Sequence, residues 1–234
     1  DLYLKIIVIL KMAEEKINIM NITKGLHFDE GYINWQLNRV LFLINLMGRD
    51  FFQGKKILEL GSYQGGVTQM FHNLGATIIG VEGSKKNLEF ARTKYPHLTF
   101  IEGDCDDTTW RYDEKYDIII HWGLLYHLKT PKESILNCIA HCDILCLETL
   151  VIDKTVQEVN FVNEDNVHKP DQALNGTGSR PTASYIEQIL TDSGTMWTRY
   201  DNTELNSKYQ PCYSAADKNT GGTYRRFWVV HTRK

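Results

Sequence analysis

The sequence lacks the cysteine patterns of a disulfide framework or a zinc site. It has five cysteines, an odd number, and no two of them form a Cys-x-x-Cys pair. A reduced protein in the cytoplasm is the simplest interpretation of this content. Cys138, Cys142 and Cys146 are spaced by four, but the chain from Asp143 onward is typical of a strand. The three thiols should therefore not share a helical face, and we predict small buried hydrophobes and no metal site.

Long apolar runs and a strong charge of one sign are also missing. The run from Leu2 to Leu10 is interrupted by Lys5 and is shorter than the roughly 20 residues that span a bilayer, and no signal cleavage site follows. We expect no membrane association. Residues 1–11 are either an upstream extension or an element that packs on a neighbour. The formal net charge of −3 gives no general affinity for polyanions. We interpret the late basic residues as a solvated strand edge and tail rather than a nucleic-acid patch; they are Arg225, Arg226, Arg233 and Lys234.

Several catalytic signatures are absent. The chain has no His-Glu-x-x-His, no serine elbow, no Gly-x-x-x-x-Gly-Lys phosphate loop and no acidic pair arranged for glycoside hydrolysis. The Gly-x-Gly-x-x-Gly spacing of nicotinamide oxidoreductases is missing too. No acidic triplet stands out that would support metal-assisted transfer.

What the sequence does have is an alternation of strands and helices. Strands are predicted at residues 56–60, 77–81, 98–101, 116–121, 144–149, 196–200 and 226–231, and helices at 29–47, 66–74, 84–94, 131–141 and 182–190, with a short one near 107–112. Such alternation predicts a mostly parallel sheet with helices on both faces. We expect residues 1–50 to form an N-terminal extension and covering helix, and residues 51–234 to form one domain.

An insert near residues 153–181 breaks this alternation. It is rich in Asn, Asp, Gly, Thr and Pro, and follows the fifth predicted strand directly. Ligands bind at the carboxyl ends of parallel strands, and a structureless insert of this length is uncommon without a function. We interpret it as a segment that covers the substrate; the alternative is a plain surface loop.

The first strand and its turn are the most informative stretch. The strand contains Glu59, and the turn holds Gly61 and Gly65 before a helix begins, an arrangement typical of nucleotide binding. The next strand ends at Glu82, twenty-one residues after Gly61. An acid at that distance can accept hydrogen bonds from both hydroxyls of an adenosine ribose. In isolation, Glu82 would be read as an exposed acid at a strand end.

Four motifs in register resemble the class I methyltransferases that use S-adenosylmethionine. They are Glu59-x-Gly61-x-Tyr63-x-Gly65, Val81-Glu82-Gly83-Ser84, Glu102-Gly103-Asp104-Cys105 and the strand Tyr116 to His121. The resemblance covers about residues 52 to 150. The segment Gly123-Leu124-Leu125-Tyr126-His127 is similar to one in small-molecule methyltransferases and in enzymes that modify wobble uridine in tRNA. Tyr63 departs from the family, whose common turn has glycine there.

The resemblance implies a Rossmann-like methyltransferase fold with a seven-stranded sheet, and S-adenosylmethionine as cofactor. Glu82 would bind the ribose, Asp104 the adenine amino group, and the Cys105 amide a ring nitrogen, while Trp122 would stack on adenine or substrate or fill the core. The cofactor-binding candidates are Glu59, Gly61, Ser62, Tyr63, Gly65, Glu82, Gly83, Asp104, Cys105, His121 and Trp122.

Methyl transfer needs an aligned nucleophile and often the removal of one proton. His127 is the best candidate base, because imidazole titrates near neutrality; its alternative is a histidine that only bonds its neighbours. Glu148 and Tyr126 are further catalytic candidates, and His168 and Arg180 are candidate substrate contacts. A free amine or an activated oxygen would need no base.

The function expected from the resemblance is methyl transfer to an oxygen or nitrogen of a small molecule. An RNA-modifying methyltransferase is the first alternative, disfavoured by the near-neutral charge and the lack of a separate RNA-binding domain. A non-catalytic protein that only binds the nucleoside is the second. The residues reveal neither the methyl acceptor nor the oligomeric state.

Overall fold

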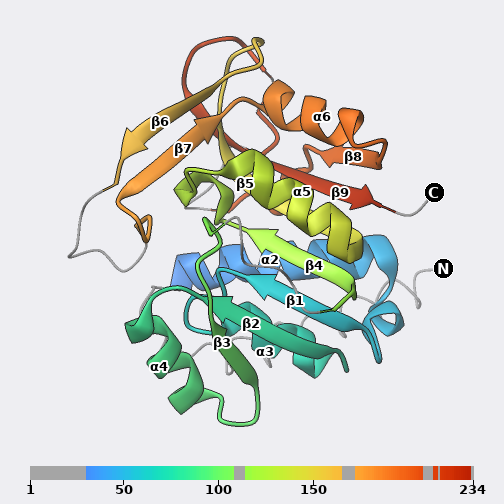
Figure 1. The fold of residues 1–234 in the computed structure, drawn as a ribbon. Coiled ribbons are helices and arrows are strands. Elements are labelled where there is room, and N and C mark those ends of the chain that lie inside the picture. Colours follow the sequence, from blue (N-terminus) through green and yellow to red (C-terminus); the bar gives the residue numbers. More distant parts are fainter. Residues whose placement is uncertain (1–29, 108–113, 165–171, 208–212, 216, 233–234) are drawn as a thin grey trace, which may run out of the picture.

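A seven-stranded sheet runs through the centre of the molecule (Figure 1). The computed structural model describes residues 30–107, 114–164, 172–207, 213–215 and 217–232. The strand order is β3-β2-β1-β4-β5-β9-β8, in which β9 pairs antiparallel with both β5 and β8 and the other neighbouring pairs are parallel. The predicted seven-stranded, mostly parallel Rossmann-like sheet is therefore confirmed.

The bounds of the elements follow the prediction closely. The strands of the sheet are β1 Lys56–Leu60, β2 Thr77–Glu82, β3 Thr99–Glu102, β4 Tyr116–Trp122, β5 Cys142–Ile152, β8 Met196–Tyr200 and β9 Thr223–His231. The helices are α2 Glu30–Met47, α3 Gly66–Asn73, α4 Lys85–Lys94, α5 Pro131–His141 and α6 Ala183–Asp192, with short 3-10 turns η1 Arg49–Phe52, η2 Leu125–His127 and η3 Thr203–Leu205.

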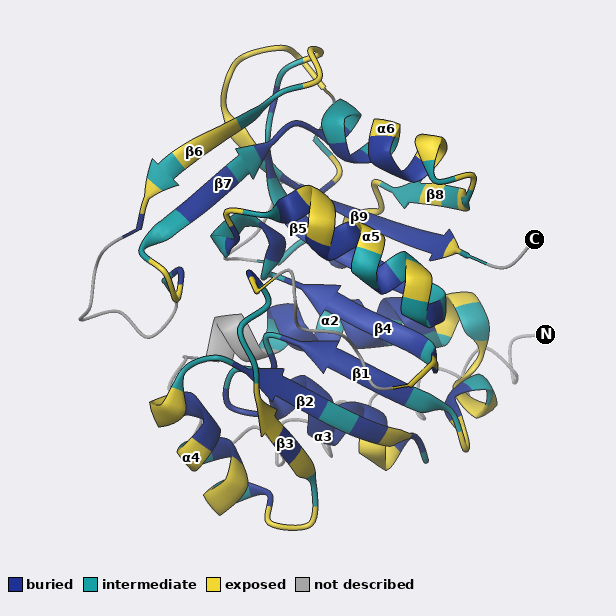
Figure 2. Cartoon of the chain, in the orientation of Figure 1, coloured by how far each residue is buried: buried dark blue, intermediate teal, exposed yellow. Residues whose placement is uncertain are grey.

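Both faces of the sheet are buried, because successive strand residues point to opposite sides. On β4, Ile118 and Ile120 pack towards α2 and α3, while Ile119 packs towards α5 and α6. Helix α4 packs beside β3 in a smaller cluster that includes Leu88 and Phe100. Figure 2 shows the buried strands between these layers.

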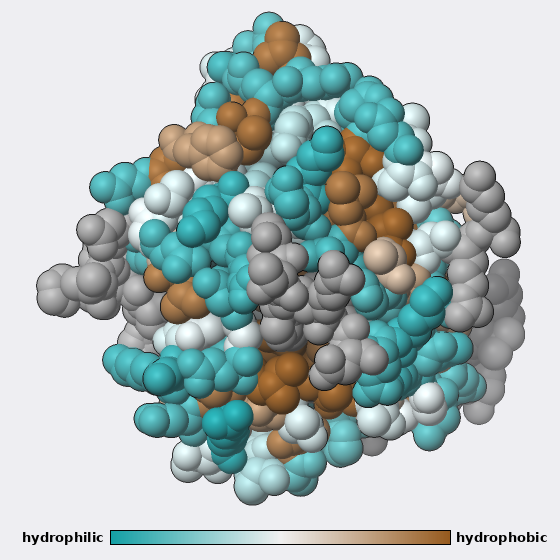
Figure 3. All heavy atoms as spheres, in the orientation of Figure 1, coloured by the Kyte–Doolittle hydropathy of each residue, from teal (hydrophilic) through white to brown (hydrophobic). Residues whose placement is uncertain are grey.

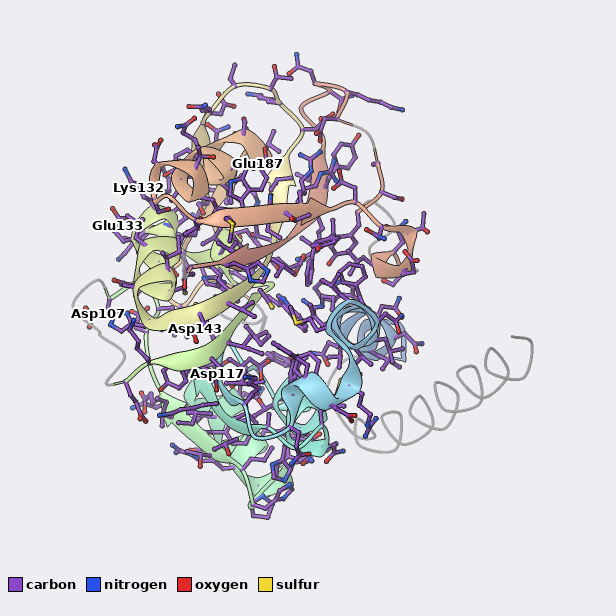
Figure 4. All side chains as sticks on the ribbon, turned by 90° about the vertical axis from the view of Figure 1, so that its right-hand side faces the viewer. Asp107, Asp117, Lys132, Glu133, Asp143 and Glu187 are labelled. Carbon is purple, nitrogen blue, oxygen red and sulfur yellow. The ribbon has the colours of Figure 1, made fainter. Side chains whose placement is uncertain are left out.

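Local signals position the helices as expected. The Ser84 hydroxyl caps α4 by accepting a hydrogen bond from the Asn87 amide, and Pro131 lies in the first turn of α5. On α6, Glu187 (labelled in Figure 4) accepts hydrogen bonds from Trp228 of β9 and Arg199 of β8, each at 3.2 Å. These bonds join the helix to the antiparallel end of the sheet.

The three cysteines spaced by four are buried, as predicted. Cys138 lies on α5, and Cys142 and Cys146 lie on β5. Burial raises the pKa of Cys142 and Cys146 well above that of an ordinary thiol. These thiols therefore behave as small apolar side chains.

The insert is not structureless, and that expectation is wrong. Strands β6 Val159–Asn163 and β7 Thr177–Pro181 pair antiparallel in a two-stranded ribbon beside the main sheet (Figure 1). Figure 2 shows that β7 is largely buried, whereas β6 is more exposed. The composition of the insert did not indicate this burial. Residues 165–171, with His168, and the residues of the expected short helix from 108 onward lie outside the described residues.

The basic residues of β9 are not a solvated edge, and that expectation is also wrong. Strand β9 is internal, between β5 and β8. Arg225 and Arg226 are both buried, and Arg226 donates a hydrogen bond of 2.7 Å to Asp217. The positions of the arginines along the sequence did not reveal that β9 has a neighbouring strand on each side. Arg233 and Lys234 lie outside the described residues.

Gly65 is required by packing as well as by its conformation. It has φ of 81° at the start of α3, and a Cβ there would lie 2.6 Å from the Phe100 ring. Gly65→Ala should therefore lower the free energy of unfolding by about 2–4 kcal/mol, from left-handed strain plus overpacking. Urea unfolding measures this loss.

Gly54→Ala is the matched control, because Gly54 has φ of 71° and no atom within 4 Å of a built Cβ. It should cost about 1–2 kcal/mol, the conformational part alone. Equal losses in the two variants would contradict the predicted contact with Phe100.

Candidate functional site

The candidate site lies where the parallel strands β1, β2, β3 and β4 end at the same edge of the sheet. The turn between β1 and α3 includes Gly61 with φ of 67° and Tyr63 with φ of 50°. A non-glycine residue in the left-handed region costs about 1–2 kcal/mol, and such strain gathers at ligand sites. A Cβ at Gly61 would lie 3.2 Å from Leu124, so the turn packs closely on the segment after β4.

Glu82 fixes the turn to the end of β2. Its Oε2 accepts a hydrogen bond of 2.8 Å from the Tyr63 amide, and its Oε1 accepts one of 2.8 Å from the Ser84 amide. The residue is 9% exposed. Burial raises the pKa of Glu82, and the bonds from Ser84 and Tyr63 oppose that shift. The carboxylate that we predicted to bind a ribose is thus held in one orientation at the strand end.

Glu59 lies beneath the turn. Its Oε2 accepts a hydrogen bond of 2.5 Å from the Thr68 hydroxyl of α3. Burial raises the pKa of Glu59 to about 8, against the lowering effects of Thr68 and Arg39. Its carboxyl group is consequently mostly protonated at neutral pH. A cation close to it would lower this pKa and favour the ionised form.

Asp104, after β3, meets the insert. Its Oδ1 accepts from the Asp106 amide at 2.9 Å, and its Oδ2 accepts from Asn175 Nδ2 at 3.0 Å. Leu174, next to Asn175, lies against Gly83. The neighbouring Cys105 packs against the core formed with α5, where burial raises the pKa of its thiol. The insert therefore reaches the end of the site that was predicted to take adenine.

A buried ion cluster lies under the ends of β4 and β5. Glu148 of β5 accepts hydrogen bonds from Arg39 of α2 at 3.0 Å and from Arg225 of β9 at 2.9 Å, and its side chain is 0% exposed. Because both oxygens are engaged with guanidinium groups, Glu148 is arranged as a charge partner rather than a proton acceptor. This geometry favours a positioning role over the catalytic one suggested by sequence.

Aromatic rings surround this cluster, and some of its donors lack partners. The Arg39 and Arg225 guanidinium carbons lie 3.9 and 4.5 Å from the Trp35 ring centroid. Within the described part of the chain, the Nε atoms of both arginines and Trp122 Nε1 have no hydrogen-bond partner. Buried donors are nearly always paired, so these favour a ligand that carries oxygen acceptors.

His127 of η2 belongs to a second cluster, with two residues of the insert. Its Nδ1 lies 2.5 Å from Glu164 Oε2, and Arg180 donates to Glu164 Oε1 at 2.7 Å. Burial raises the pKa of Glu164, but the hydrogen bonds and charges of His127 and Arg180 outweigh it and hold the pKa at about 2. An ionised carboxylate only accepts hydrogen bonds, so Nδ1 of His127 is the donor and Nε2 takes no part in this contact.

Tyr126 links the two clusters. Its ring centroid lies 4.0 Å from that of His127, its hydroxyl accepts from Arg225 at 3.2 Å, and its carbonyl accepts from Arg180 at 2.9 Å. The sequence candidates His127, Tyr126 and Glu148 are thus joined through Arg225. Tyr126 is placed to hold the ring of His127, the candidate base, and its own hydroxyl is bonded to Arg225.

His121 and Trp122, adjacent on β4, point to opposite faces. The His121 ring is completely buried and lies 3.0 Å from Ser134 of α5, and burial lowers its pKa to about 4. Trp122 packs on the α2 and α3 side, against Phe71 and Phe227. Only Trp122 brings its side chain to the face of the Arg39 cluster, so the His121 side chain is a packing group.

Sequence reasoning missed Glu164, Arg39 and Arg225 as site residues. Arg39 follows Trp35 by one helical turn, and that i, i+4 spacing was the available signal. Glu164 and Arg225 carried no local signal, because their partners are 37 and 77 residues away.

Other site types receive no support from the described residues. They contain no group of three or more His, Cys, Asp or Glu side chains that could hold a metal ion. None of the helices searched in this part of the chain is long and apolar enough to cross a membrane.

Comparison with known proteins agrees with this geometry. Residues 57–142 match the family model described as a methyltransferase domain. The structure superposes on the N-terminal domain of EvdMO1 with SAH bound, with a TM-score of 0.67, 16% identity and coverage of 94% of this chain and 97% of that one. Residues 57–142 of this chain are thus similar to a methyltransferase domain, and the fold is that of the superposed structure.

Other similar proteins are named as methyltransferases. Magnesium protoporphyrin IX methyltransferase from Synechocystis, solved with bound SAM, superposes on the domain with a TM-score of 0.57, 15% identity and coverage of 90% of this chain and 88% of that one. A ubiquinone biosynthesis O-methyltransferase of Proteus mirabilis is 28% identical over 90 residues, which is 36% of each chain. The match with this chain spans less than half the length of the curated relatives.

The raised pKa of Glu59 predicts a pH dependence of stability. The pKa of Glu59 is about 8 in the folded state, whereas that of a free glutamate side chain is 4.5. The stabilisation is complete below pH 4.5 and is lost as the pH rises towards about 8. Glu59→Gln should therefore remove part of the decline in the free energy of unfolding over this range.

Urea unfolding at several pH values measures the effect, and Glu89→Gln removes the same charge at an exposed position of α4. Parallel stability curves for wild type and Glu59→Gln would contradict the prediction.

Proposed function

We propose that the protein transfers a methyl group from S-adenosylmethionine to an oxygen or nitrogen atom of a small molecule. The single observation that carries this is the fixed Glu82 carboxylate, hydrogen-bonded to the turn after β1 at the end of β2. A ribose diol is the ligand that such a carboxylate suits in this fold. The SAH and SAM in the titles of similar structures support the choice of cofactor.

The residues of the site fit the three parts of this cofactor. Glu82 would hold the ribose, and Asp104, the Cys105 amide and the surface at Gly83 would hold the adenine. The methionine part would lie along the turn that contains Gly61, Ser62, Tyr63 and Gly65, above Glu59. The partnerless donors Trp122 Nε1 and Arg39 Nε would suit the carboxylate of the cofactor or a polar acceptor.

The cofactor, when bound, supplies a methyl group activated by its sulfonium. The chain must then hold the acceptor in line, keep water out and accept a proton from a hydroxyl nucleophile. His127 is suited to that last task, because Glu164 binds Nδ1 and leaves Nε2 free to take the proton. Glu148 and Tyr126 act through Arg225 as positioning residues.

Two observations favour a small acceptor. Curated relatives are named ubiquinone biosynthesis O-methyltransferases, enzymes whose name refers to a small molecule. The arginines of β9, which could have formed a surface for nucleic acid, are buried in ion pairs. No described feature favours RNA as the acceptor.

Isothermal titration with S-adenosylmethionine, S-adenosylhomocysteine and NAD tests the cofactor assignment. Both sulfur compounds should bind and NAD should not. Glu82→Gln should weaken binding of S-adenosylhomocysteine at least about tenfold, since charge-assisted bonds to the diol become neutral ones. No binding of either sulfur compound by wild type would refute the proposed function.

His127→Gln should lower kcat by about 10²- to 10⁴-fold, the usual contribution of a general base, while cofactor affinity stays the same. His72→Gln, at an exposed position of α3, is the matched control. A methyl-transfer assay with a panel of hydroxylated aromatic acceptors measures both. Wild-type turnover in His127→Gln would mean that the acceptor needs no base.

A further inference from the structure

A short loop of the insert reaches the predicted adenine end of the site. Asn175 Nδ2 donates to Asp104 Oδ2 at 3.0 Å. Leu174 Cδ2 lies 2.7 Å from the position that a Cβ of Gly83 would take. Glycine at 83 thus leaves a space on the domain surface, and an apolar side chain from a segment 91 residues away fills it.

Glu164 anchors this loop. Its Oε2 accepts a hydrogen bond of 3.0 Å from the Ala173 amide, and its own amide donates to the Gly176 carbonyl at 2.9 Å. The same carboxylate binds His127 and Arg180, and its side chain is 6% exposed. Charge-assisted bonds of this kind are about twice as strong as neutral ones. The loop is therefore a fixed part of the structure rather than a freely moving segment.

Leu174 retains an unused apolar surface. It contacts Gly83 and yet is 54% exposed. It borders a hollow of about 650 Å³, which is otherwise lined by Phe161, Val162, Asn163, Asn175, Gly176 and Thr177. On the face seen in Figure 3, apolar atoms are exposed among hydrophilic ones over the ribbon. A flat apolar ring with polar edges, such as a purine, would bury this side chain beside a carboxylate.

We propose that residues 172–176 form the outer wall of the adenosine site, in which Leu174 packs against the purine and Asn175 orients the Asp104 carboxylate towards the exocyclic amine. Glu164 ties this wall to His127, so a single carboxylate positions both the cofactor and the base. The inference rests on the proposed function, since it concerns the same cofactor.

The contacts indicate that residues 172–176 stay in place beside the cofactor as a wall. The alternative is a plug that blocks the site and that the cofactor would have to displace. A plug must leave, and departure here would break the bonds of Ala173 and Gly176 with Glu164. A carboxylate oxygen accepts more than one hydrogen bond, so Asn175 does not exclude an amine at Asp104. The amide instead restricts the carboxylate to one rotamer.

Titration of S-adenosylhomocysteine into Leu174→Ala and Val156→Ala, two variants at exposed positions of the insert, tests whether Leu174 contacts the cofactor. Leu174→Ala should weaken binding about tenfold, because it removes apolar contact with the ring. Val156→Ala is the matched control, at 53% exposure on the insert but away from Gly83. Affinity unchanged in Leu174→Ala would overturn the inference, and tighter binding would show that the loop is a plug.

Asn175→Ala tests recognition of the amine. Wild type should prefer S-adenosylhomocysteine over its inosine analogue, which has no exocyclic amine, and Asn175→Ala should reduce that preference several-fold. If Asn175→Ala keeps the wild-type preference for S-adenosylhomocysteine over the inosine analogue, Asn175 has no role in recognising the exocyclic amine. If wild type binds neither compound, the proposed function fails; if wild type binds and Leu174→Ala equals Val156→Ala, only this inference fails.

Glu164→Gln tests the coupling. It should lower kcat and also raise the dissociation constant of the cofactor, whereas His127→Gln should lower kcat alone. Thermal melting of each variant separates these effects from unfolding. If Glu164→Gln is folded and binds the cofactor with wild-type affinity, Glu164 does not couple the wall of residues 172–176 to the proposed base His127.

Discussion

The buried carboxylate of Glu148 is the constraint on which the packing of α2 against β5 and β9 depends. It binds Arg39 and Arg225, and so joins α2, the internal strand β5 and the antiparallel strand β9. Removing one member of a buried pair leaves an uncompensated charge and costs about 3–5 kcal/mol. The cluster therefore fixes the position of the N-terminal helix over the ends of the strands.

Two arginines to one glutamate also give this region an excess of positive charge. A buried charge is expensive without a partner, and Glu59 at the adjacent strand end is mostly protonated at neutral pH. An anionic group of a ligand would compensate the excess. The imbalance is thus a feature expected of a binding site and not of a purely structural ion pair.

The core of the fold followed from sequence because its signals are local. Uninterrupted apolar residues such as Ile118 to Ile120 predict a strand buried on both faces, and the spacing from Gly61 to Glu82 predicts the nucleotide turn. The ribbon was missed because β7 is polar in sequence and is buried where it packs on η2 and β5, whereas its partner β6 is largely exposed. Arg225 and Arg226 were misread for the same reason, since strand order, not composition, decides whether a strand is an edge.

The same distinction separates the two glutamates that organise the site. Glu82 was predictable, because its partners lie at the ends of consecutive strands. Glu164 was not, because it acts across the insert and η2. Both carboxylates accept backbone amides and thereby hold a loop in place before any ligand arrives. Preorganised groups need little rearrangement when charge develops. Glu82 belongs to the core fold and Glu164 to the insert, so the insert contributes to holding His127, the proposed base, and also reaches Asp104 at the proposed adenine end.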